Sequence, residues 1–469
     1  MTTVDERGTS VALPGDPAFE AATQVFNLAA PAEPAAAVTA RTVEEVRAAI
    51  RYAESERLPV RVHTTGHAAA TARPMHNALL IRTELGGAVE VDAQRRVARI
   101  PAGTRWGAVV EAVAPHGLAA PHGSAATVGV VGYLLRGGLS FYSRKVGLAV
   151  NSVRAIELVT ADGELRRVDA SSDPELFWAL RGGGGGFGVV TAVEVDLFPV
   201  ARVVTGAAFW PAVHAAALLR TWREWTLDAP SEATTSLRVF NLPPLPEIPP
   251  VLRAGTVLCV DGVVLSATED DVTTAQRQAE DLLEPLRSVA EPVLDTWELT
   301  TPPAVLHAHM DPADPVPIAG DHLLLDEIGE DGAGEFVRVV GEGSGSPLVV
   351  AGLRQLGGAC SVPDPAGGAL THLAARFAYS GAGVPDSPAT AAAIRSHCAT
   401  VRAALSPWDT GRTAPTFVEN LEQPQGHLSP DQVLAIDQVR DRVDPSGRFR
   451  DDILPGTYSP AARSRPTGS

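Results

Sequence analysis

Residues 123–140 read GSAATVGVVGYLLRGGLS, a stretch in which five glycines recur among small and apolar residues. Glycine lets the backbone turn successive N–H groups toward one anion, and such a nest binds phosphate groups without a basic side chain. We interpret the stretch as a candidate diphosphate cradle, to which Ser124 and Thr127 add hydroxyl donors. The alternative is a small-residue segment that only lets neighbouring elements pack closely. A Walker motif is excluded, because no glycine run is followed by Lys and then Ser or Thr.

A second glycine run, RGGGGGFG at 181–188, matches the pattern GxGxxG. In a dinucleotide-binding Rossmann unit that pattern follows a strand and opens a helix. Here a short helix that starts at Asp173 and Pro174 comes before the run, and an alternating strand at 189–197 comes after it. The order argues against a Rossmann site. The run either lets the backbone approach a flat ligand closely or is a plain tight connection.

The third candidate segment is HTTGH at 63–67, which follows a short strand predicted at 59–63. Two histidines four residues apart can bind a metal when they share a helix face. Thr-Thr-Gly has low helix propensity, however, and no HExxH motif occurs. We therefore predict no metal site. An ordinary buried or solvent-facing histidine is the plain interpretation. The functional alternative is a histidine at a loop tip that attaches a cofactor covalently.

Composition excludes several classes of function. Fifty-five acids against 38 bases in 469 residues give a net charge of −17, which disfavours nucleic acid and anionic membrane surfaces as partners. The three separate cysteines, Cys259, Cys360 and Cys398, indicate neither a disulfide framework nor a cysteine zinc site. No signal peptide, membrane-length apolar stretch or GxSxG elbow occurs, so we expect a cytoplasmic protein that is not an α/β-hydrolase.

The pattern of predicted elements indicates an α+β protein of more than one domain. A capping box at Thr42 and Glu45 predicts a helix at 43–56, and strands at 153–160 and 164–168 form a predicted hairpin. From about 203 to 380, strand-like runs alternate with proline-rich loops and helices near 268–287 and 388–405. We expect an antiparallel sheet covered by helices there. A last helix is predicted from Ser429 to Asp444.

The segments TTGH, GSAATVGVVGYLLRGGLSFYSRKVGLAVNSV and LFWALRGGGGGFGVVTAVEVDLFP, in this order, resemble the FAD-linked oxidases of the vanillyl-alcohol oxidase superfamily, and most closely its bacterial berberine-bridge-enzyme-like branch. The resemblance implies a two-lobed PCMH-type FAD-binding domain plus a substrate domain. The expected boundaries are a 1–30 extension, a 31–200 FAD-binding domain, a 201–410 substrate-binding domain, a 411–458 segment that returns to the FAD domain and a disordered tail at 459–469.

The resemblance also implies FAD as cofactor, joined through its 8α-methyl group by a single covalent link to His67. His63 stands where the family has an arginine, and the 123–138 stretch resembles the family's diphosphate and isoalloxazine cradle. The implied cofactor-binding residues are His63, Thr64, Thr65, Gly66, His67, Gly123, Ser124, Thr127, Val128, Gly129, Gly132, Tyr133, Gly137, Gly138, Leu139, Gly188, Val190 and Asn420.

The chain departs from the family pattern at several flavin-facing positions. Ala125 replaces the cysteine that makes a second flavin link in many relatives, which leaves only the histidyl link. Phe417 or Val418 occupies the place of the tyrosine in the family's YxN segment. Gly186 replaces an asparagine. Arg136 and Ser140 each replace a glycine.

Our leading hypothesis from the resemblance is an FAD-dependent oxidase of a bulky, largely apolar small molecule, in secondary-metabolite or antibiotic biosynthesis, with O2 as second substrate. The candidate catalytic bases are Tyr142, Tyr379 and Glu419. A non-redox cyclase, for example one that performs a cycloaddition, is the alternative, because the family tyrosine is absent. A third class is a binding protein that has lost the cofactor and would be colourless. We expect a monomer or homodimer.

Overall fold

The first domain starts with a small parallel sheet. In the computed structural model its three strands, β3 (Ala36–Ala40), β5 (Leu79–Thr83) and β4 (Val60–His63), lie in the order β3-β5-β4. Helix α2 (Val43–Ser55) connects β3 to β4, and Thr42 and Glu45 form the predicted capping box at its start. Strand β4 therefore ends at the HTTGH segment, which it holds at the carboxyl edge of a buried sheet.

A five-stranded antiparallel sheet completes the core of this domain. Its order is β10-β9-β11-β7-β6, and its strands are β6 (Glu90–Asp92), β7 (Val97–Pro101), β9 (Val153–Val159), β10 (Leu165–Asp169) and β11 (Val189–Asp196). Ile156 and Val193 pack on the core that also receives Ile50 of α2. The alternation of apolar and charged residues thus buries one face of the sheet.

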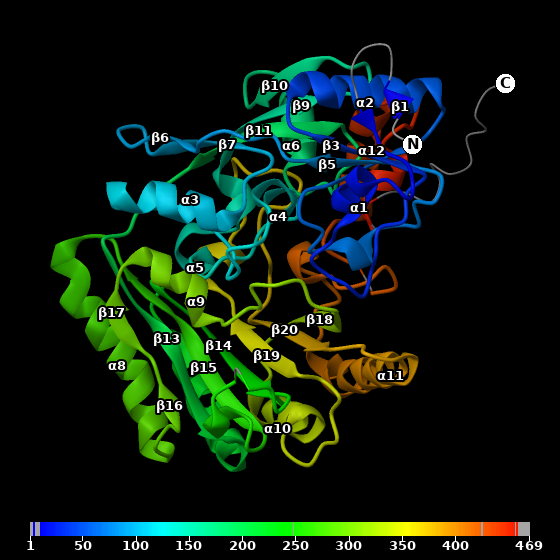
Figure 1. Cartoon of the computed structure of the whole chain (residues 1–469). Coiled ribbons are helices and arrows are strands. Elements are labelled where there is room, and N and C mark those ends of the chain that lie inside the picture. The colour runs from blue at the N-terminus through cyan, green and yellow to red at the C-terminus, as the bar shows by residue number, and fades with distance from the viewer. Residues whose placement is uncertain (1–2, 5–9, 247, 424, 455, 458–469) are drawn as a thin grey trace.

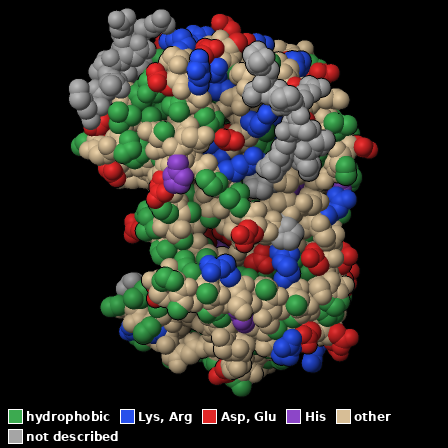
Figure 2. Space-filling view, turned by 90° about the vertical axis from the view of Figure 1, so that its right-hand side faces the viewer, with side chains coloured by type: hydrophobic (Ala, Val, Ile, Leu, Met, Phe, Trp, Pro, Cys, Tyr) green, Lys and Arg blue, Asp and Glu red, His purple; other side chains and the backbone are tan. Residues whose placement is uncertain are grey.

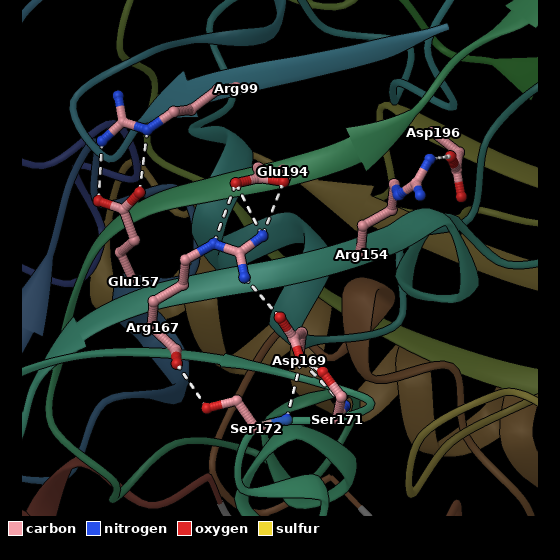
Figure 3. A network of polar contacts seen from close by, with 9 residues as sticks. All are labelled: Arg99, Arg154, Glu157, Arg167, Asp169, Ser171, Ser172, Glu194 and Asp196. Atoms are coloured by element: carbon pink, nitrogen blue, oxygen red, sulfur yellow. Dashed lines mark hydrogen bonds and ion pairs between the residues drawn. The ribbon is translucent and has the colours of Figure 1, made fainter. Parts of the chain in front are cut away.

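The other face of this sheet carries charged side chains that pair with one another across the strands (Figure 3). Arg99 of β7 donates two hydrogen bonds to Glu157 of β9, at 2.9 and 2.8 Å, and Arg167 of β10 pairs with Glu194 of β11 at 3.1 Å. Exposed pairs of this kind contribute about 0–1 kcal/mol each. The network therefore marks the solvent-facing side of the sheet, away from the ligand-binding segments.

The second domain is a large antiparallel sheet with helices on one face (Figure 1). The sheet has the order β16-β13-β15-β14-β19-β20-β18, with β17 also paired to β13. Its strands are β13 (Arg202–Pro211), β14 (Ala233–Phe240), β15 (Val257–Ser266), β16 (Leu294–Asp295), β17 (Glu298–Thr300), β18 (Ala319–Leu325), β19 (Val350–Gln355) and β20 (Phe377–Gly383). The covering helices are α7 (Ala215–Asp228), α8 (Val272–Val289), α10 (Gly329–Val340) and α11 (Pro388–Leu405).

Alternation along the central strands decides what each face of this sheet presents. Leu237, Val260 and Leu353 pack against the helices in one apolar core. Their neighbours Arg238 and Arg354 point to the other face, toward the first domain, because successive side chains of a strand face opposite sides. The sheet thus offers a polar wall to the first domain.

The last described segment lies against the first domain again. Helix α12 (Pro430–Val443) packs beside α6 (Pro174–Leu180), and the Val60 amide donates a 2.8 Å hydrogen bond to the carbonyl of Arg448. Phe449 and Ile436 belong to the first domain's core. The first domain is therefore assembled from two parts of the chain that are far apart in sequence.

The structure describes residues 3–4, 10–246, 248–423, 425–454 and 456–457, so the predicted tail at 459–469 lies outside the described residues. Helix α1 (Pro17–Thr23), within the predicted 1–30 extension, packs on β3 of the first domain. Among the described helices none combines the length and the apolar character that a membrane span requires. The predicted α+β class, with an antiparallel sheet covered by helices, is confirmed.

Candidate cofactor and substrate site

A cavity of about 750 Å³ lies where the two domains and the C-terminal segment meet. The surface is indented between the two lobes (Figure 2). The walls of the cavity come from HTTGH, from both glycine segments, from the polar face of the second-domain sheet and from residues 416–421 and 452–454. Small-molecule sites in proteins typically enclose roughly 300–1,000 Å³. The three segments singled out in the sequence therefore share one cavity of suitable size.

The HTTGH turn directs His67 into this cavity. Gly66 has φ +71°, and a Cβ there would lie 2.6 Å from Val25 Cα, so only glycine fits the turn. The His67 ring stacks on Phe26 with 3.7 Å between ring centroids. Its Nε2 is buried and has no hydrogen-bond partner among the described residues. Burial lowers the pKa of His67 to about 4, so the imidazole is neutral.

His63 lines the same cavity but its ring is engaged elsewhere. Its Nε2 is 2.9 Å from the carbonyl oxygen of Ala22, and burial lowers its pKa to about 4. The next residue, Thr64, bonds to Thr83 Oγ1 at 2.7 Å and fixes the turn to β5. Of the two histidines, His67 alone therefore has a ring nitrogen that is buried and unpartnered among the described residues.

The 123–140 stretch forms a second wall. Gly129 precedes the short helix α4 (Val130–Leu135) and packs on Thr64. Gly137 and Gly138 have φ of +94° and +67° and lie behind the wall, where Cβ atoms would meet Leu370 and Tyr133. The positive-φ pair thus serves the packing of the segment and does not line the cavity.

The run at 181–188 forms the floor of the cavity and also binds the C-terminal segment. Gly184, Gly185, Phe187 and Gly188 line the cavity. Arg440 of α12 donates hydrogen bonds to the carbonyls of Gly183 and Gly185. The run therefore connects α6 to β11 (Val189–Asp196) in the predicted order of helix, glycines and strand.

The second domain supplies polar groups that the sequence reasoning missed. Ser236 and Arg238 of β14, Arg354 of β19 and His309 and Asp311 of the loop after α9 (Val305–Ala308) line the cavity. One signal was available, because Arg238, Asp261 and Arg354 are each the single charged residue of a strand. A charge inside such a strand points to a polar site on one face of the sheet.

Comparisons with known proteins identify the first domain. The family model described as "FAD binding domain" matches residues 34–169. Residues 34–169 are an FAD-binding domain. FAD-dependent monooxygenase FUP4 of Fusarium proliferatum is 36% identical over 207 residues, covering 44% of this chain and 40% of that protein. (R)-6-hydroxynicotine oxidase of Paenarthrobacter nicotinovorans is 33% identical over 213 residues, covering 45% of this chain and 46% of that protein. The chain thus spans less than half of each of these two relatives.

Solved structures extend the likeness to the whole fold. The wild-type protein Physcomitrella patens BBE-like 1 superimposes with a TM-score of 0.80 at 18% identity, covering 97% of this chain and 98% of that one. Chitooligosaccharide oxidase gives a TM-score of 0.77 at 19% identity, with 95% and 97% covered. The predicted resemblance to berberine-bridge-enzyme-like, PCMH-type FAD-linked oxidases is confirmed for the fold. FAD is the cofactor of the domain at 34–169.

The side chains of the FAD-binding domain suit this cofactor. Arg61, Arg73 and Arg136 line one part of the cavity, and their positive charge complements a diphosphate. Nε and Nη1 of Arg61 make no hydrogen bond among the described residues. The unpartnered His67 Nε2 suits attachment of the flavin ring. The residues present therefore fit FAD.

Fourteen of the 18 predicted cofactor-binding residues line the cavity. They are His63, Thr64, Thr65, Gly66, His67, Gly123, Ser124, Val128, Gly129, Gly132, Tyr133, Leu139, Gly188 and Val190. Thr127, Gly137, Gly138 and Asn420 do not line it. Asn420 donates instead to the Gly320 carbonyl at 3.2 Å, which anchors the C-terminal segment to the second domain.

The structure does not bring Tyr142 or Tyr379 to the cavity. Tyr142 is fully buried between His122 and Phe198, with ring centroids 5.3 and 5.2 Å away, and its pKa is raised by burial. Tyr379 lies among the helices of the second-domain core, where burial also raises its pKa. A phenol with a raised pKa and no access to the cavity is poorly placed to accept a proton from a ligand there.

Glu419 is the predicted catalytic residue that does line the cavity. Burial raises its pKa to about 7, although the charge of Arg136 acts in the opposite direction. A carboxyl group that titrates near neutral pH can hold or release a proton under physiological conditions. Across the described part of the chain, no three His, Cys, Asp or Glu side chains gather as a metal site would require.

Proposed function

We propose that the protein is an FAD-dependent oxidase of a bulky, largely apolar small molecule. The observation that carries the proposal is the shared cavity, in which the FAD-binding segments face a polar wall of the second domain. Bound FAD would supply a two-electron acceptor that dioxygen reoxidises with formation of hydrogen peroxide. The fold likeness to chitooligosaccharide oxidase, with a TM-score of 0.77, supports an oxidase.

In this proposal the chain's own residues bind, orient and handle protons. Arg61 and Arg136 would hold the diphosphate, and His67 Nε2 would form the single covalent link. Phe417 and Val418 give the cavity an apolar wall that suits an apolar substrate. Glu419 is available as a proton acceptor. Secondary-metabolite or antibiotic biosynthesis, a cytoplasmic location and a monomeric or homodimeric state belong to the same proposal.

A non-redox cyclase remains the second candidate, and one observation favours it. Phe417 and Val418, one of which stands at the place of the family's tyrosine, both line the cavity with side chains that move no proton. Catalysis would then consist of holding a flexible substrate in a reactive conformation.

Anaerobic mixing of the purified protein with candidate substrates tests the proposal. An oxidase loses its flavin absorbance when substrate is added without air, and regains it when air is admitted. A cyclase forms product while the flavin stays oxidised. Protein without flavin absorbance would contradict both candidates and leave the non-catalytic binding protein.

A further inference from the structure

The second-domain wall of the cavity contains a series of three side chains in contact: Asp261, His309 and Arg354. Asp261 of β15 is fully buried, and its Oδ2 accepts a 2.6 Å hydrogen bond from Arg238 Nε. Its Oδ1 lies 3.0 Å from Nδ1 of His309. Nε2 of the same imidazole lies 3.3 Å from Nη2 of Arg354. His309 thus connects a buried carboxylate to a guanidinium at the cavity surface.

These contacts fix the tautomer of His309. A guanidinium donates hydrogen bonds and accepts none, so the Nε2 that faces Arg354 carries the lone pair. Nδ1 therefore carries the proton and donates it to Asp261. Burial and the charge of Arg238 lower the pKa of His309, which favours the neutral ring before substrate binds. A neutral imidazole held by a carboxylate in this way is a prepared proton acceptor.

Arg354 lies next to Nε2 of His309 and does not use its full hydrogen-bonding capacity. It is 6% exposed, lies 4.2 Å from the centroid of the Phe141 ring, and makes hydrogen bonds of 3.3 Å to Ser236 and 3.5 Å to the Leu139 carbonyl. In the described part of the chain it forms no ion pair within 4.0 Å. A buried guanidinium with long hydrogen bonds retains capacity for an oxygen ligand.

The loop that carries His309 is held in a strained conformation. Met310 has φ +52°, which is unusual for a residue with a side chain. The turn places His309 and Asp311 in the same cavity, and Ser124 of the FAD-binding domain fixes Asp311 at 2.5 Å. Strain of this kind persists where the surroundings hold a functional group in place.

We propose that His309 Nε2 and Arg354 together bind a hydroxyl group of the substrate, and that His309, oriented by Asp261, takes the hydroxyl proton. This inference rests on the proposed oxidase function and names its substrate class, an alcohol that becomes a carbonyl compound. One C–H and one O–H bond break and a C=O bond forms. Bound FAD would accept the hydrogen on carbon as hydride, with its two electrons, and the proton would remain on His309. Arg354 stabilises the oxygen as negative charge develops on it.

The charges around His309 support this assignment. Arg238 and Arg354 face it from β14 and β19, Asp261 from β15, and Asp311 from its own loop. The two arginines and the two aspartates balance in charge. A proton on His309 is then stabilised by the direct contact with Asp261, while Arg354 remains free to stabilise the substrate oxygen.

Binding of 4-nitrophenol to the oxidised, flavin-loaded protein tests the site without turnover. The probe absorbs at longer wavelength when it is ionised, so a difference spectrum reports its state at a pH where the free probe is mostly protonated. We expect the wild type to bind it as phenolate, with the proton on His309. 4-Nitroanisole, which has no hydroxyl group, should bind at least about tenfold more weakly, as expected when a charge-assisted hydrogen bond is lost.

The variants separate His309 from other proton acceptors. His309→Gln should bind the probe in its neutral form, and Arg354→Gln should weaken phenolate binding by about 10–100-fold. Asp261→Asn is a positioning variant, which should lower the phenolate fraction. His307→Gln, the same change at an exposed histidine outside the cavity, should behave as wild type. Flavin content and thermal midpoint establish that each variant is folded, and Arg354→Gln gives an independent result if His309→Gln is unstable.

Phenolate formation that persists in His309→Gln but is lost in Glu419→Gln would overturn the proposal, as would a wild type that binds only the neutral phenol or none. These results are distinct from failure of the oxidase function. A protein that binds nitrophenolate but whose flavin no alcohol reduces contradicts the oxidase and retains the hydroxyl site. A protein whose flavin is reduced by substrate without phenolate binding contradicts only the hydroxyl site.

Discussion

The Ser124 hydroxyl donates a 2.5 Å hydrogen bond to Oδ2 of Asp311. Ser124 belongs to the glycine segment of the FAD-binding domain, and Asp311 belongs to the strained loop of the second domain. The bond therefore joins the two domains at the wall of the cavity and fixes the loop that carries His309.

Ser124→Ala should lower the free energy of unfolding by about 1–3 kcal/mol, because a charged acceptor loses its donor. Urea denaturation of the flavin-loaded protein measures this value. Ser396→Ala, at an exposed site on α11, is the control and should change stability by less than about 0.5 kcal/mol. Equal effects of the two changes would show that the contact between the domains contributes nothing.

His67→Ala should release the flavin when the protein is precipitated with acid. The wild-type precipitate should stay yellow, because a covalent link to Nε2 survives denaturation. His63→Ala is the matched control, since the His63 ring is already bonded to the Ala22 carbonyl, and its precipitate should stay coloured. A colourless wild-type precipitate would contradict the covalent link and leave FAD binding intact.

Glu419→Gln should change how stability depends on pH. The folded protein holds the Glu419 proton up to about pH 7, against an ordinary value of 4.5. The folded state therefore binds this proton more tightly than the unfolded chain, and wild-type stability falls as pH rises from 4.5 through 7. The variant lacks this loss and should be more stable than wild type by up to about 3 kcal/mol at pH 8, with little difference at pH 5.

Thermal midpoints of wild type and Glu419→Gln at the two pH values measure this effect. Glu422→Gln, at an exposed position in the same segment, should follow wild type at both. If Glu419→Gln lost stability at the higher pH, the Glu419 carboxylate would have to be ionised and well paired in the folded protein.

Gly138→Ala should destabilise the protein by more than about 2 kcal/mol and reduce its flavin content. Gly138 has φ +67°, and an added Cβ would lie 2.5 Å from a ring carbon of Tyr133, which lines the cavity. Gly334→Ala, within helix α10 where no atom lies within 4 Å of the new Cβ, should instead stabilise by about 0.5–1 kcal/mol. Chemical denaturation and flavin absorbance distinguish the two substitutions.

Local signals in the sequence predicted local structure well. The capping box at Thr42 predicted a helix at 43–56, and α2 spans Val43–Ser55. The predicted hairpin corresponds to β9 and β10. These elements depend on contacts between residues close in sequence, so their pattern suffices. Helix α4 was not predicted, because its six residues lie inside a segment rich in glycine, which disfavours helix.

Two features could not be predicted from the sequence: the polar wall that the second domain gives the cavity, and the orientation of the Tyr142 side chain. Arg238, His309 and Arg354 meet only because β14 and β19 pair in one register and the loop after α9 crosses them. No short-range pattern encodes that register. Tyr142 has the right chemistry for a base, but its side chain points to His122 and Phe198 inside the protein, a direction that residue type does not reveal.

The return of α12 and residues 444–454 to the first domain has a consequence for biosynthesis of the protein. Arg440 binds the carbonyls of the 181–188 run, and the Arg448 carbonyl receives the amide of Val60 beside HTTGH. Although domains usually fold as they leave the ribosome, the FAD pocket cannot be complete until these last elements have emerged. Flavin should therefore be captured after translation of the chain is nearly finished, and a nascent chain stalled before residue 430 should not retain it.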